Sequence, residues 1–317
     1  MNRIYLDFEK PIQELMERIE QFKQDYIGNE EGLKKELEKY NKKLEKTIKN
    51  IFSELEPWQV VQIARHPQRP YTQDYIDLIV EDFFELHGDR NFRDDPSIIG
   101  GIGKIGGKKF VIIGHEKGRG TRQKIHRNFG MAHPEGYRKA MRMMKLGEKF
   151  KLPIITLIDT PGAFPGIGAE ERGQAEAIAR NLKEMSLLRT PTISVVIGEG
   201  GSGGALGIGV TDKIIMLQYS IYSVISPEGC ASILFRDASR AKESAQALKL
   251  TAENLKSLKI IDEIIPEPAC GAHTDYQVIA DRVRDAIIRN VDELKNLDLD
   301  TLLENRFKKY KEIGVYK

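Results

Sequence analysis

Residues 192–207 constrain this chain more than any other part of its sequence. They read Thr-Ile-Ser-Val-Val-Ile-Gly-Glu-Gly-Gly-Ser-Gly-Gly-Ala-Leu-Gly, a β-branched strand that runs into six glycines around one serine. Residues without side chains let the backbone approach a ligand closely. A helix beginning near Gly203 would direct unpaired N–H groups and the positive end of its dipole at that ligand. The segment therefore predicts a site for an anion or a developing oxyanion.

A dinucleotide pattern overlaps this segment but lacks its usual context. Residues 198–203 fit G-x-G-x-x-G. A dinucleotide-binding unit also needs a full crossover helix and an acidic residue at the end of the next strand. Here the next strand-like run, 213–218, follows after about two helical turns and ends in Gln218. We therefore do not favour a dinucleotide site.

A nucleophile-elbow pattern also fits, because residues 200–204 match G-x-S-x-G around Ser202. A serine hydrolase then needs an acid and a histidine later in the chain. His273 is the only histidine after Ser202, and Asp237 or Asp262 would have to supply the acid. None of these three lies in a recognisable motif, so a serine hydrolase using Ser202 is kept as the alternative function.

The third interpretation is an oxyanion hole made of backbone amides, with Gly203 and Gly204 as the best donors. Such a site needs no side-chain nucleophile. A tight glycine turn without any chemistry is also compatible with the pattern.

Composition favours a soluble cytoplasmic protein. The first ten residues are too charged for a secretory signal, and no apolar run approaches the roughly 18 residues that span a bilayer. The two cysteines, Cys230 and Cys270, cannot form a disulfide framework or a four-thiolate zinc site. We expect a reduced, cytoplasmic setting and no membrane contact.

The middle of the chain alternates between strand-like and helix-like segments, which predicts an α/β fold with a largely buried sheet. Gly106-Gly107 separates the two strands of a hairpin, and Pro134 stands at the start of a helix. The predicted strands are 98–104, 109–114, 152–158, 192–197, 213–217 and 221–225, and the predicted helices are 134–149 and 170–179.

Charged helical segments flank this middle part. Residues 11–55 carry apolar side chains at helical spacing with a break at Gly28-Asn29, which predicts two amphipathic helices. These helices could form a hairpin packed on the body or an arm that contacts another subunit. After Pro268 the chain is again charged and helical to its end.

A second glycine-rich loop, residues 159–168, follows the strand at 152–158. Its Asp-Thr-Pro-Gly start resembles the D-x-x-G element of nucleotide hydrolases, but the sequence has no phosphate-binding G-x-x-x-x-G-K-[ST] motif. Its prolines and glycines favour a stiff pocket wall with Phe164 as an apolar face. Because both glycine loops follow strands, a parallel sheet would bring them to the edge where ligands bind.

Residues 104–151 concentrate positive charge, with 14 Lys and Arg against three Glu in a chain whose net charge is +2. Arg138, Arg142, Lys145 and Lys149 recur every three or four residues and so share one helix face. Such a stripe is either a solvated face or a surface that attracts a polyanion, such as a phosphorylated cofactor or nucleic acid. Without a recognition motif, nucleic acid is the weaker choice.

Several longer motifs resemble those of the α subunits of bacterial acetyl-CoA carboxylase carboxyltransferases. They are Arg-His-Pro-Gln-Arg-Pro-Tyr at 65–71, Arg-Asn-Phe-Gly-Met at 127–131, Pro-Glu-Gly-Tyr-Arg-Lys at 134–139, the glycine segments 159–173 and 198–209, and Tyr-Ser-Val-Ile-Ser-Pro-Glu-Gly-Cys-Ala-Ser-Ile-Leu at 222–234. The likeness runs in the same order from residue 6 to the helical tail, so it covers nearly the whole chain.

The resemblance implies a crotonase-like (ClpP/crotonase) fold, a spiral of ββα units with helical extensions at both ends. It also implies three parts of the chain. These are an N-terminal helical extension over 1–56, a carboxyltransferase core over 57–268 and a C-terminal helical segment over 269–317.

The resemblance further implies the α subunit of a biotin-dependent carboxyltransferase. It would move a carboxyl group from carboxybiotin on biotin carboxyl carrier protein to acetyl-CoA, giving malonyl-CoA for fatty acid biosynthesis. The implied partners are a zinc-ribbon β subunit in an α2β2 heterotetramer, the carrier protein, and biotin carboxylase in the larger ATP-dependent complex. The resemblance places the metal on the β subunit, so no metal is expected on this chain. Biotin is not expected on this chain, because Met144-Lys145 lies in a basic helix.

The resemblance assigns site residues by position. Gly203 and Gly204 would stabilise the ureido oxygen of the donor. Ser226 is equally compatible with a plain helix cap. The expected substrate and carboxybiotin contacts are Gly162, Ala163, Phe164, Pro165, Gly201, Ser226, Pro227, Glu228 and Gly229, and the candidate phosphate or carrier contacts are Lys117, Arg119, Arg138 and Arg142.

Overall fold

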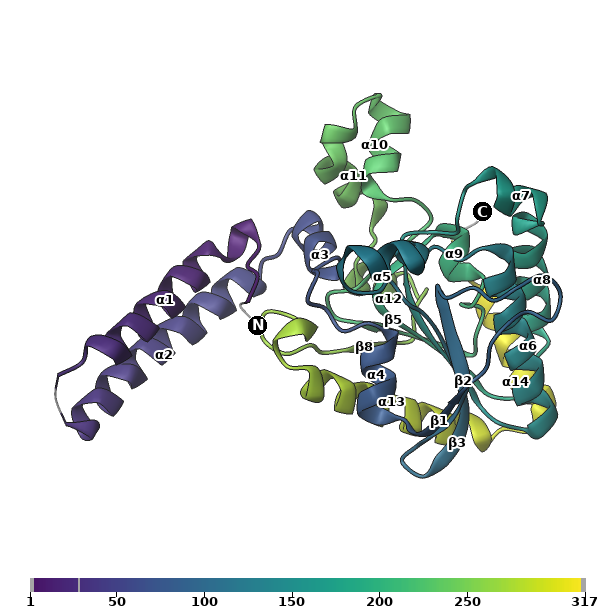
Figure 1. Cartoon of the computed structure of the whole chain (residues 1–317), viewed down its shortest axis with the longest axis horizontal. Coiled ribbons are helices and arrows are strands. Elements are labelled where there is room, and N and C mark those ends of the chain that lie inside the picture. Colours follow the sequence, from purple (N-terminus) through teal and green to yellow (C-terminus); the bar gives the residue numbers. More distant parts are fainter. Residues whose placement is uncertain (1–2, 28, 315–317) are drawn as a thin grey trace.

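The predicted central strands lie side by side in one mixed sheet. The structure is a computed structural model that describes residues 3–27 and 29–314. Along the sheet the strand order is β1-β2-β3-β4-β5-β6-β8, and β7 pairs with β5 beside this path. Helices cover both faces of the sheet (Figure 1), as the alternating α/β pattern predicts.

The predicted hairpin is confirmed near the start of the sheet. β2 (Ile98–Ile105) and β3 (Lys108–His115) pair antiparallel in continuous register. Gly106 and Gly107 have φ of 56° and 74°, the left-handed conformation that a two-residue hairpin turn needs. β1 (Glu81–Glu85) adds an antiparallel edge strand that was not predicted, because its mostly exposed residues lack an apolar alternation.

Parallel strands carry the chain to the candidate site. β4 (Ile154–Thr160), β5 (Thr192–Gly201), β6 (Lys213–Leu217) and β8 (Glu263–Ile265) are neighbours in that order. β4 is buried along its whole length and β5 along all but its last residue, which is typical of a parallel sheet covered on both faces. β7 (Ile221–Ser223) pairs with the glycine-rich end of β5.

Helices connect the strands and extend the chain at both ends. Within the part of the chain that the structure describes, none of them is both long and apolar enough to cross a membrane. Their bounds are α1 (Lys10–Asp25), α2 (Glu30–Phe52), α3 (Pro57–Ala64), α4 (Thr72–Ile79), α5 (Gly120–His126), α6 (Pro134–Phe150), α7 (Ile167–Glu171), α8 (Gln174–Ser186), α9 (Ser202–Leu206), α10 (Pro227–Phe235), α11 (Ala241–Leu248), α12 (Ala252–Ser257), α13 (Tyr276–Lys295) and α14 (Leu299–Lys311).

Alternate residues of each strand point to opposite faces of the sheet and build two apolar cores. On one face, Ile155 and Leu157 of β4 share a core with residues of α4 and α13. On the other face, Ile154 and Ile158 share a core with residues of α6 and α8. The sheet is therefore the middle of three layers.

The two predicted N-terminal helices are confirmed as α1 and α2, which pair with each other and extend away from the sheet (Figure 1). α1 buries Ile12, Leu15 and Ile19, whereas none of the described residues of α2 is buried. Asn29 caps α2 with its side chain, and Gly28, the other residue of the predicted break, lies outside the described residues. The choice between a packed hairpin and a subunit-contact arm stays open.

The C-terminal helices are tied to the central sheet. α13 places Ile279, Val283 and Ile287 in the same core as the strands. In α14 the buried guanidinium of Arg306 donates to both carboxylate oxygens of Asp212, at 2.7 and 2.8 Å. The division of the chain into residues 1–56, 57–268 and 269–317 remains a prediction.

The predicted single helix over residues 170–179 is wrong, because the chain forms α7 and α8 with a break at Arg172-Gly173. Gly173 has φ 81°, a left-handed conformation that is common where a helix ends. The break starts α8 at Gln174, whose amide donates to the carbonyls of Ala132 and Phe164, at 2.9 Å each. These bonds hold the second glycine loop in place.

Candidate active site

The glycine-rich segment is a strand that passes directly into a helix. β5 continues through Gly201, which corrects the prediction that the strand ends at residue 197 and gives way to a loop. The strand end is tightly enclosed, because a Cβ at Gly201 would lie 2.2 Å from the carbonyl oxygen of Pro161. α9 then begins at Ser202, one residue before the predicted start.

The first turn of α9 presents backbone amides that lack partners within the helix. The N-cap is Gly201, and no side chain caps this turn in the described structure. Ser202 has φ 48°, so the chain turns sharply there. Gly203 is partly exposed and Gly204 is buried. The predicted donors therefore stand at a strand–helix junction, the place that the oxyanion-hole interpretation requires.

The two glycine-rich segments meet at α9. A Cβ at Gly204 would lie 2.4 Å from the carbonyl carbon of Gly162 and 2.7 Å from the nitrogen of Ala163. Both neighbours are backbone atoms, so only a residue without a side chain fits. At Gly203 the nearest atom would be Ile178 Cδ1 at 3.6 Å, an ordinary contact. The predicted convergence of the two segments at one sheet edge is confirmed.

Phe164 and Pro165 continue the second glycine loop beyond the contact with Gly204. Phe164 is half-buried and its ring lies 4.5 Å from the ring of His133. Its backbone N–H donates to the carbonyl of Ala132 at 3.0 Å. Pro165 is exposed. The expected substrate contacts of these two residues remain predictions.

The start of α10 forms the opposite wall of the site. Ser226 accepts a hydrogen bond from the amide of Gly229 at 3.0 Å, so its role as a helix cap is confirmed. Ser226 and Pro227 also line a narrow cavity of about 20 Å³ together with Gly200 and Gly201. Residues of the two sequence segments that were predicted to line one site thus line the same narrow cavity.

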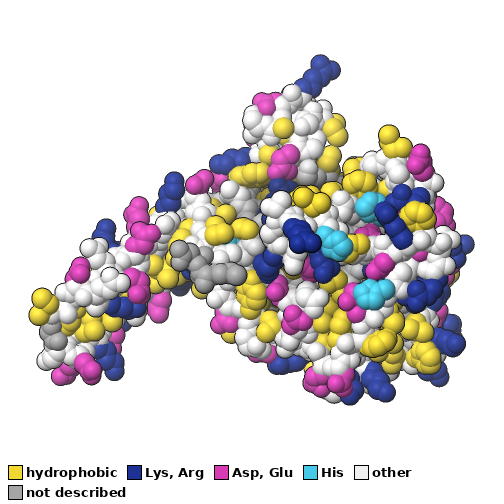
Figure 2. Space-filling model, viewed as in Figure 1, with side chains coloured by type: hydrophobic (Ala, Val, Ile, Leu, Met, Phe, Trp, Pro, Cys, Tyr) yellow, Lys and Arg dark blue, Asp and Glu magenta, His cyan; other side chains and the backbone are white. Residues whose placement is uncertain are grey.

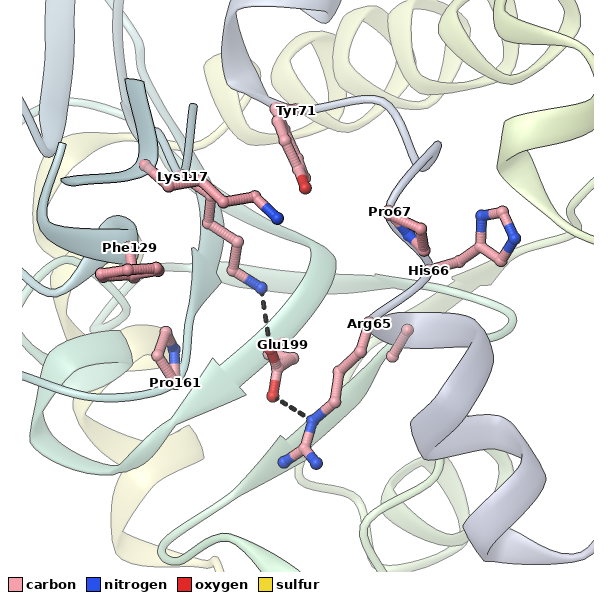
Figure 3. Close-up of a pocket in the computed structure, with 10 residues that line it drawn as sticks. Arg65, His66, Pro67, Tyr71, Lys117, Phe129, Pro161 and Glu199 are labelled. Atoms are coloured by element: carbon pink, nitrogen blue, oxygen red, sulfur yellow. Dashed lines mark hydrogen bonds and ion pairs between the residues drawn. The ribbon is translucent and has the colours of Figure 1, made fainter. Parts of the chain in front are cut away.

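A chain of five charged side chains joins these walls, and Figure 3 shows Lys117, Glu199 and Arg65 among them. Lys117 donates to Asp159 and to Glu199, at 2.8 Å each. Arg65 donates to the other carboxylate oxygen of Glu199 at 2.6 Å and to Glu228 at 2.5 Å. The backbone N–H of Glu199 also donates to Asp159 at 2.9 Å. The cluster links β4, β5 and the segment that follows β3 with the end of α3 and the start of α10.

Mutual pairing keeps Glu199 and Lys117 charged in spite of their burial. Burial on its own would raise the pKa of Glu199, but Lys117 and Arg65 lower that pKa to about 2. Burial would lower the pKa of Lys117, yet Asp159 and Glu199 raise it. The pKa of Asp159 is raised because burial outweighs the nearby ammonium. Glu199 and Lys117 therefore stay ionised at neutral pH. They lie beside the turn formed by residues 200–204, which we call the glycine turn.

The cluster borders a cavity of about 240 Å³ (Figure 3). Its polar side includes Arg65, Lys117 and Glu199, and its apolar side includes Tyr71 and Phe129. Arg65 and Glu199 also line the narrow cavity beside Ser226, so the two cavities share a wall. The described residues contain no group of three or more His, Cys, Asp or Glu side chains that could hold a metal ion.

Sequence reasoning missed Arg65, Asp159 and Glu199 as site residues. One signal was available, because Glu199 is the only charged residue of an apolar, glycine-rich strand and a buried charge needs a partner. The sequence gives no comparable signal for the residue that pairs with Glu199. Arg65 lies 134 residues earlier in the chain, and only the fold brings the two together.

The four residues that were predicted to contact phosphate or the carrier form ion pairs or hydrogen bonds with other residues of this chain. Lys117 belongs to the charged cluster. Arg119 donates to Asp74 at 2.5 Å. Arg138 donates to Asp89 at 2.8 Å, and Arg142 donates to two backbone carbonyls. These contacts hold loops against the body, and a role of the four residues in binding phosphate or a carrier remains a prediction.

The segment at residues 65–71 crosses the site and is anchored by Arg69. The buried guanidinium of Arg69 donates to the carbonyl of Ile197 at 2.6 Å and makes two bonds to Glu267, at 2.8 and 2.5 Å. A bidentate pair of this kind fixes direction as well as distance. The anchor therefore sets the position of Arg65 relative to β5.

The side chains of a hydrolase triad are not brought together. Ser202 has the sharp turn of a nucleophile elbow, but His273 stacks on His66 with ring centroids 3.8 Å apart. Asp237 and Asp262 are engaged with other partners. Among the described residues, no hydrogen bond joins Ser202 to the histidine or to either acid. The serine-hydrolase alternative is not favoured.

We expect the stacked histidines to make stability depend on pH. Burial lowers the pKa of His66 to about 4 and that of His273 to about 3, from 6.5. Below pH 6.5 the unfolded chain binds protons that the folded chain excludes, so the free energy of unfolding falls as the pH falls. The slope is up to about 1.4 kcal/mol per pH unit for each ring. Urea unfolding between about pH 7 and about pH 5 measures it.

His273→Gln removes one of these rings and should make the decline shallower. His126→Gln is the matched control, because His126 is exposed and its replacement leaves the stacked pair in place. Equal slopes for the wild type and His273→Gln would contradict the assignment of the pH dependence to the buried pair.

Comparisons with known proteins identify the family of this chain. A family model described as acetyl co-enzyme A carboxylase carboxyltransferase-like matches residues 5–314. A protein of Methylococcus capsulatus is 55% identical over 316 residues, covering 100% of this chain and 98% of that protein. One of Geobacter metallireducens is 54% identical, covering 98% of each chain. Both are named acetyl-coenzyme A carboxylase carboxyl transferase subunit alpha.

Solved structures show the same fold at low sequence identity. Transcarboxylase 12S with methylmalonyl-coenzyme A bound matches with a TM-score of 0.59 and 18% identity, over 72% of this chain and 42% of that chain. The β subunit of Pseudomonas aeruginosa geranyl-CoA carboxylase matches with a TM-score of 0.55 and 17% identity, over 77% and 46%. This chain spans less than half of those two chains. The predicted crotonase-like fold is confirmed.

Proposed function

The chain belongs to the acetyl-CoA carboxylase carboxyltransferase-like family, and we propose from this premise how it works. It acts as the α subunit of a biotin-dependent carboxyltransferase that gives malonyl-CoA for fatty acid biosynthesis. The carboxyl donor is carboxybiotin on a carrier protein and the acceptor is acetyl-CoA. Neither is attached to this chain.

The observation that carries the proposal is the strand–helix junction at Ser202, where the amides of Gly203 and Gly204 lack partners within the helix. When a carboxyl group leaves a urea nitrogen, negative charge gathers on the urea oxygen. Two fixed amides can stabilise that oxygen by about 3 kcal/mol each, by comparison with other oxyanion holes. We infer that these amides are the catalytic groups of this chain.

The proposal requires no side-chain base on this chain. The urea nitrogen that loses the carboxyl group can itself accept the proton of the acetyl methyl group. This agrees with the charged cluster at the site, where Lys117 and Glu199 are paired with each other and so are poorly placed to transfer protons. The cluster instead supports the ends of the strands that carry the glycine turn.

We propose that the site is completed by a zinc-ribbon β subunit in an α2β2 heterotetramer, which meets the carrier protein and biotin carboxylase in a larger complex. The segment that contains α10 and α11 projects from the body beside the site, and it has exposed apolar side chains suited to such an interface (Figure 2). Val224, Ile233 and Leu234 are 75%, 71% and 65% exposed. We expect the β subunit to cover them and to supply a second oxyanion hole, for the thioester enolate.

Ser202→Ala separates this function from hydrolysis. In the complex with a β subunit we expect the rate of carboxyl transfer from malonyl-CoA to a soluble biotin derivative to stay within about threefold of the wild type, because the Ser202 hydroxyl has no part in the proposed chemistry. A fluorophosphonate should not label Ser202. Loss of transfer in a folded Ser202→Ala protein, or labelling of Ser202, would contradict the proposal.

A further inference from the structure

We propose that Arg65 is a positioning residue that fixes the spacing between the glycine turn and the start of α10. This inference rests on the proposed function. The guanidinium is shared by carboxylates from two different walls of the site. Its Nε donates to Glu199 at 2.6 Å, and its two terminal nitrogens donate to the two carboxylate oxygens of Glu228, at 2.5 and 3.3 Å.

The two carboxylates lie close to the groups that the site must hold together. Glu199 belongs to β5, whose last residue is the N-cap of α9. Glu228 belongs to the first turn of α10, which Ser226 caps. Arg65 is itself the C-cap of α3. One side chain thus connects three elements at the point where the glycine turn and the opposite wall face each other.

Glu199 cannot follow Arg65 if α10 shifts, because it is held from its other side. Lys117 donates to the second carboxylate oxygen of Glu199 at 2.8 Å and also to Asp159 at the end of β4. The sheet side of the contact is therefore rigid. If the contact changes, it is therefore α10 with Glu228 that moves.

α10 needs such a link because it belongs to a segment that projects from the body (Figure 1). Its Ile233 and Leu234 are exposed, so apolar packing fixes that face of the helix weakly. The base of the segment is better held, since Ala245 of α11 shares a small core with Val60 and Val61 of α3. Arg65 adds a polar contact at the end of the segment that faces the site.

The expected consequence is a change in the width of the narrow cavity beside the glycine turn. Gly201 and Pro227 line that cavity from opposite sides, and Arg65 and Glu199 line it as well. A guanidinium can serve both carboxylates because its donors form a planar fork, whereas an ammonium is a point charge. Without the fork the two walls can separate, and reacting groups held about 1 Å out of place lose roughly 100-fold in rate.

The test uses Arg65→Ala and Arg65→Lys in the complex with the β subunit, with carboxyl transfer from malonyl-CoA to a soluble biotin derivative as the readout. For Arg65→Ala we expect kcat to fall by about 10- to 100-fold, while the KM for malonyl-CoA changes by less than about threefold. Arg65→Lys should recover little of the loss. Millimolar guanidinium should restore much of the rate of Arg65→Ala, and methylammonium should not.

A second set of variants tests the link to Glu228. Glu228→Gln should lower kcat as well, and combining it with Arg65→Ala should add little further loss, because both changes break one contact. Arg284→Ala is the matched control. Arg284 is also shared by two carboxylates, Asp281 at 2.6 Å and Asp285 at 2.9 Å, but all three lie on the exposed face of α13. Its removal should leave transfer unchanged.

Two results would overturn the inference while leaving the proposed function intact. One is an active wild type with an Arg65→Ala variant within twofold of it. The other is a loss in Arg65→Ala that guanidinium does not reverse and that follows a drop in the thermal unfolding midpoint, which would make Arg65 a residue of general stability. An inactive wild-type complex would instead overturn the proposed function.

Discussion

We expect the replacement of Gly204 with alanine to lower the kcat/KM of carboxyl transfer by about 100- to 1,000-fold, the loss that follows removal of one oxyanion-hole donor in other enzymes. The added Cβ would lie 2.4 Å from the carbonyl carbon of Gly162. Because that neighbour is backbone, α9 has to move as a unit. The movement takes the amides of Gly203 and Gly204 away from the oxygen that we propose they stabilise. Steady-state transfer in the assembled complex measures the loss.

Gly203→Ala is the matched control for this prediction. Its Cβ would meet only Ile178 Cδ1 at 3.6 Å, an ordinary apolar contact, so α9 should keep its place. We expect a loss of less than about tenfold, because the amide itself is retained. Thermal unfolding of both variants checks that they are folded. A Gly204→Ala variant within tenfold of the wild type, or equal large losses for both variants, would contradict the role of close backbone approach.

The second large effect is the dependence on a partner. Transfer between a urea and a thioester creates negative charge in two places, and each needs its own donors in a preorganised site. The junction at Ser202 can serve one of them. The apolar side chains Val224, Ile233 and Leu234 stand exposed nearby, which is typical of a surface that another protein covers. We expect the rate with the chain alone to be below about 1% of the rate with a β subunit.

The strands and the meeting of the two glycine segments could be predicted from the sequence. The apolar runs at β4, β5 and β6 have only one way to be buried, between helices on both faces of a parallel sheet. A parallel sheet brings the ends of neighbouring strands to one edge. The contact between Gly204 and Gly162 follows from these two facts, and the structure has it.

Local sequence patterns predicted the ends of strands and helices less reliably where tertiary contacts decide the conformation. Gly198, Gly200 and Gly201 have little strand propensity of their own. The strand β5 nevertheless continues through them, because β7 pairs with residues 199–201. The polar edge strand β1 was missed for the opposite reason, since its residues are mostly exposed and show no alternation. The break at Gly173 was missed because a single glycine in a helical pattern does not by itself end a helix.

The charged cluster could not be predicted because it depends on distances between residues far apart in sequence. Lys117 and Glu228 are paired with Glu199 and Arg65, and their expected ligand contacts remain predictions. The contacts of the basic residues on α6 could not be predicted for the same reason. Arg138 and Arg142 do share a helix face, but that face meets a loop of the same chain, which accepts their hydrogen bonds.

The most direct test of the central claim, that this chain supplies one half of a carboxyltransferase site, is carboxyl transfer between malonyl-CoA and a soluble biotin derivative. It is measured with the chain alone, with a zinc-ribbon β subunit alone and with both, after complex formation has been verified by gel filtration. We expect transfer only when both are present. Transfer by the chain alone at the rate of the mixture, or none in a verified complex, would contradict the claim.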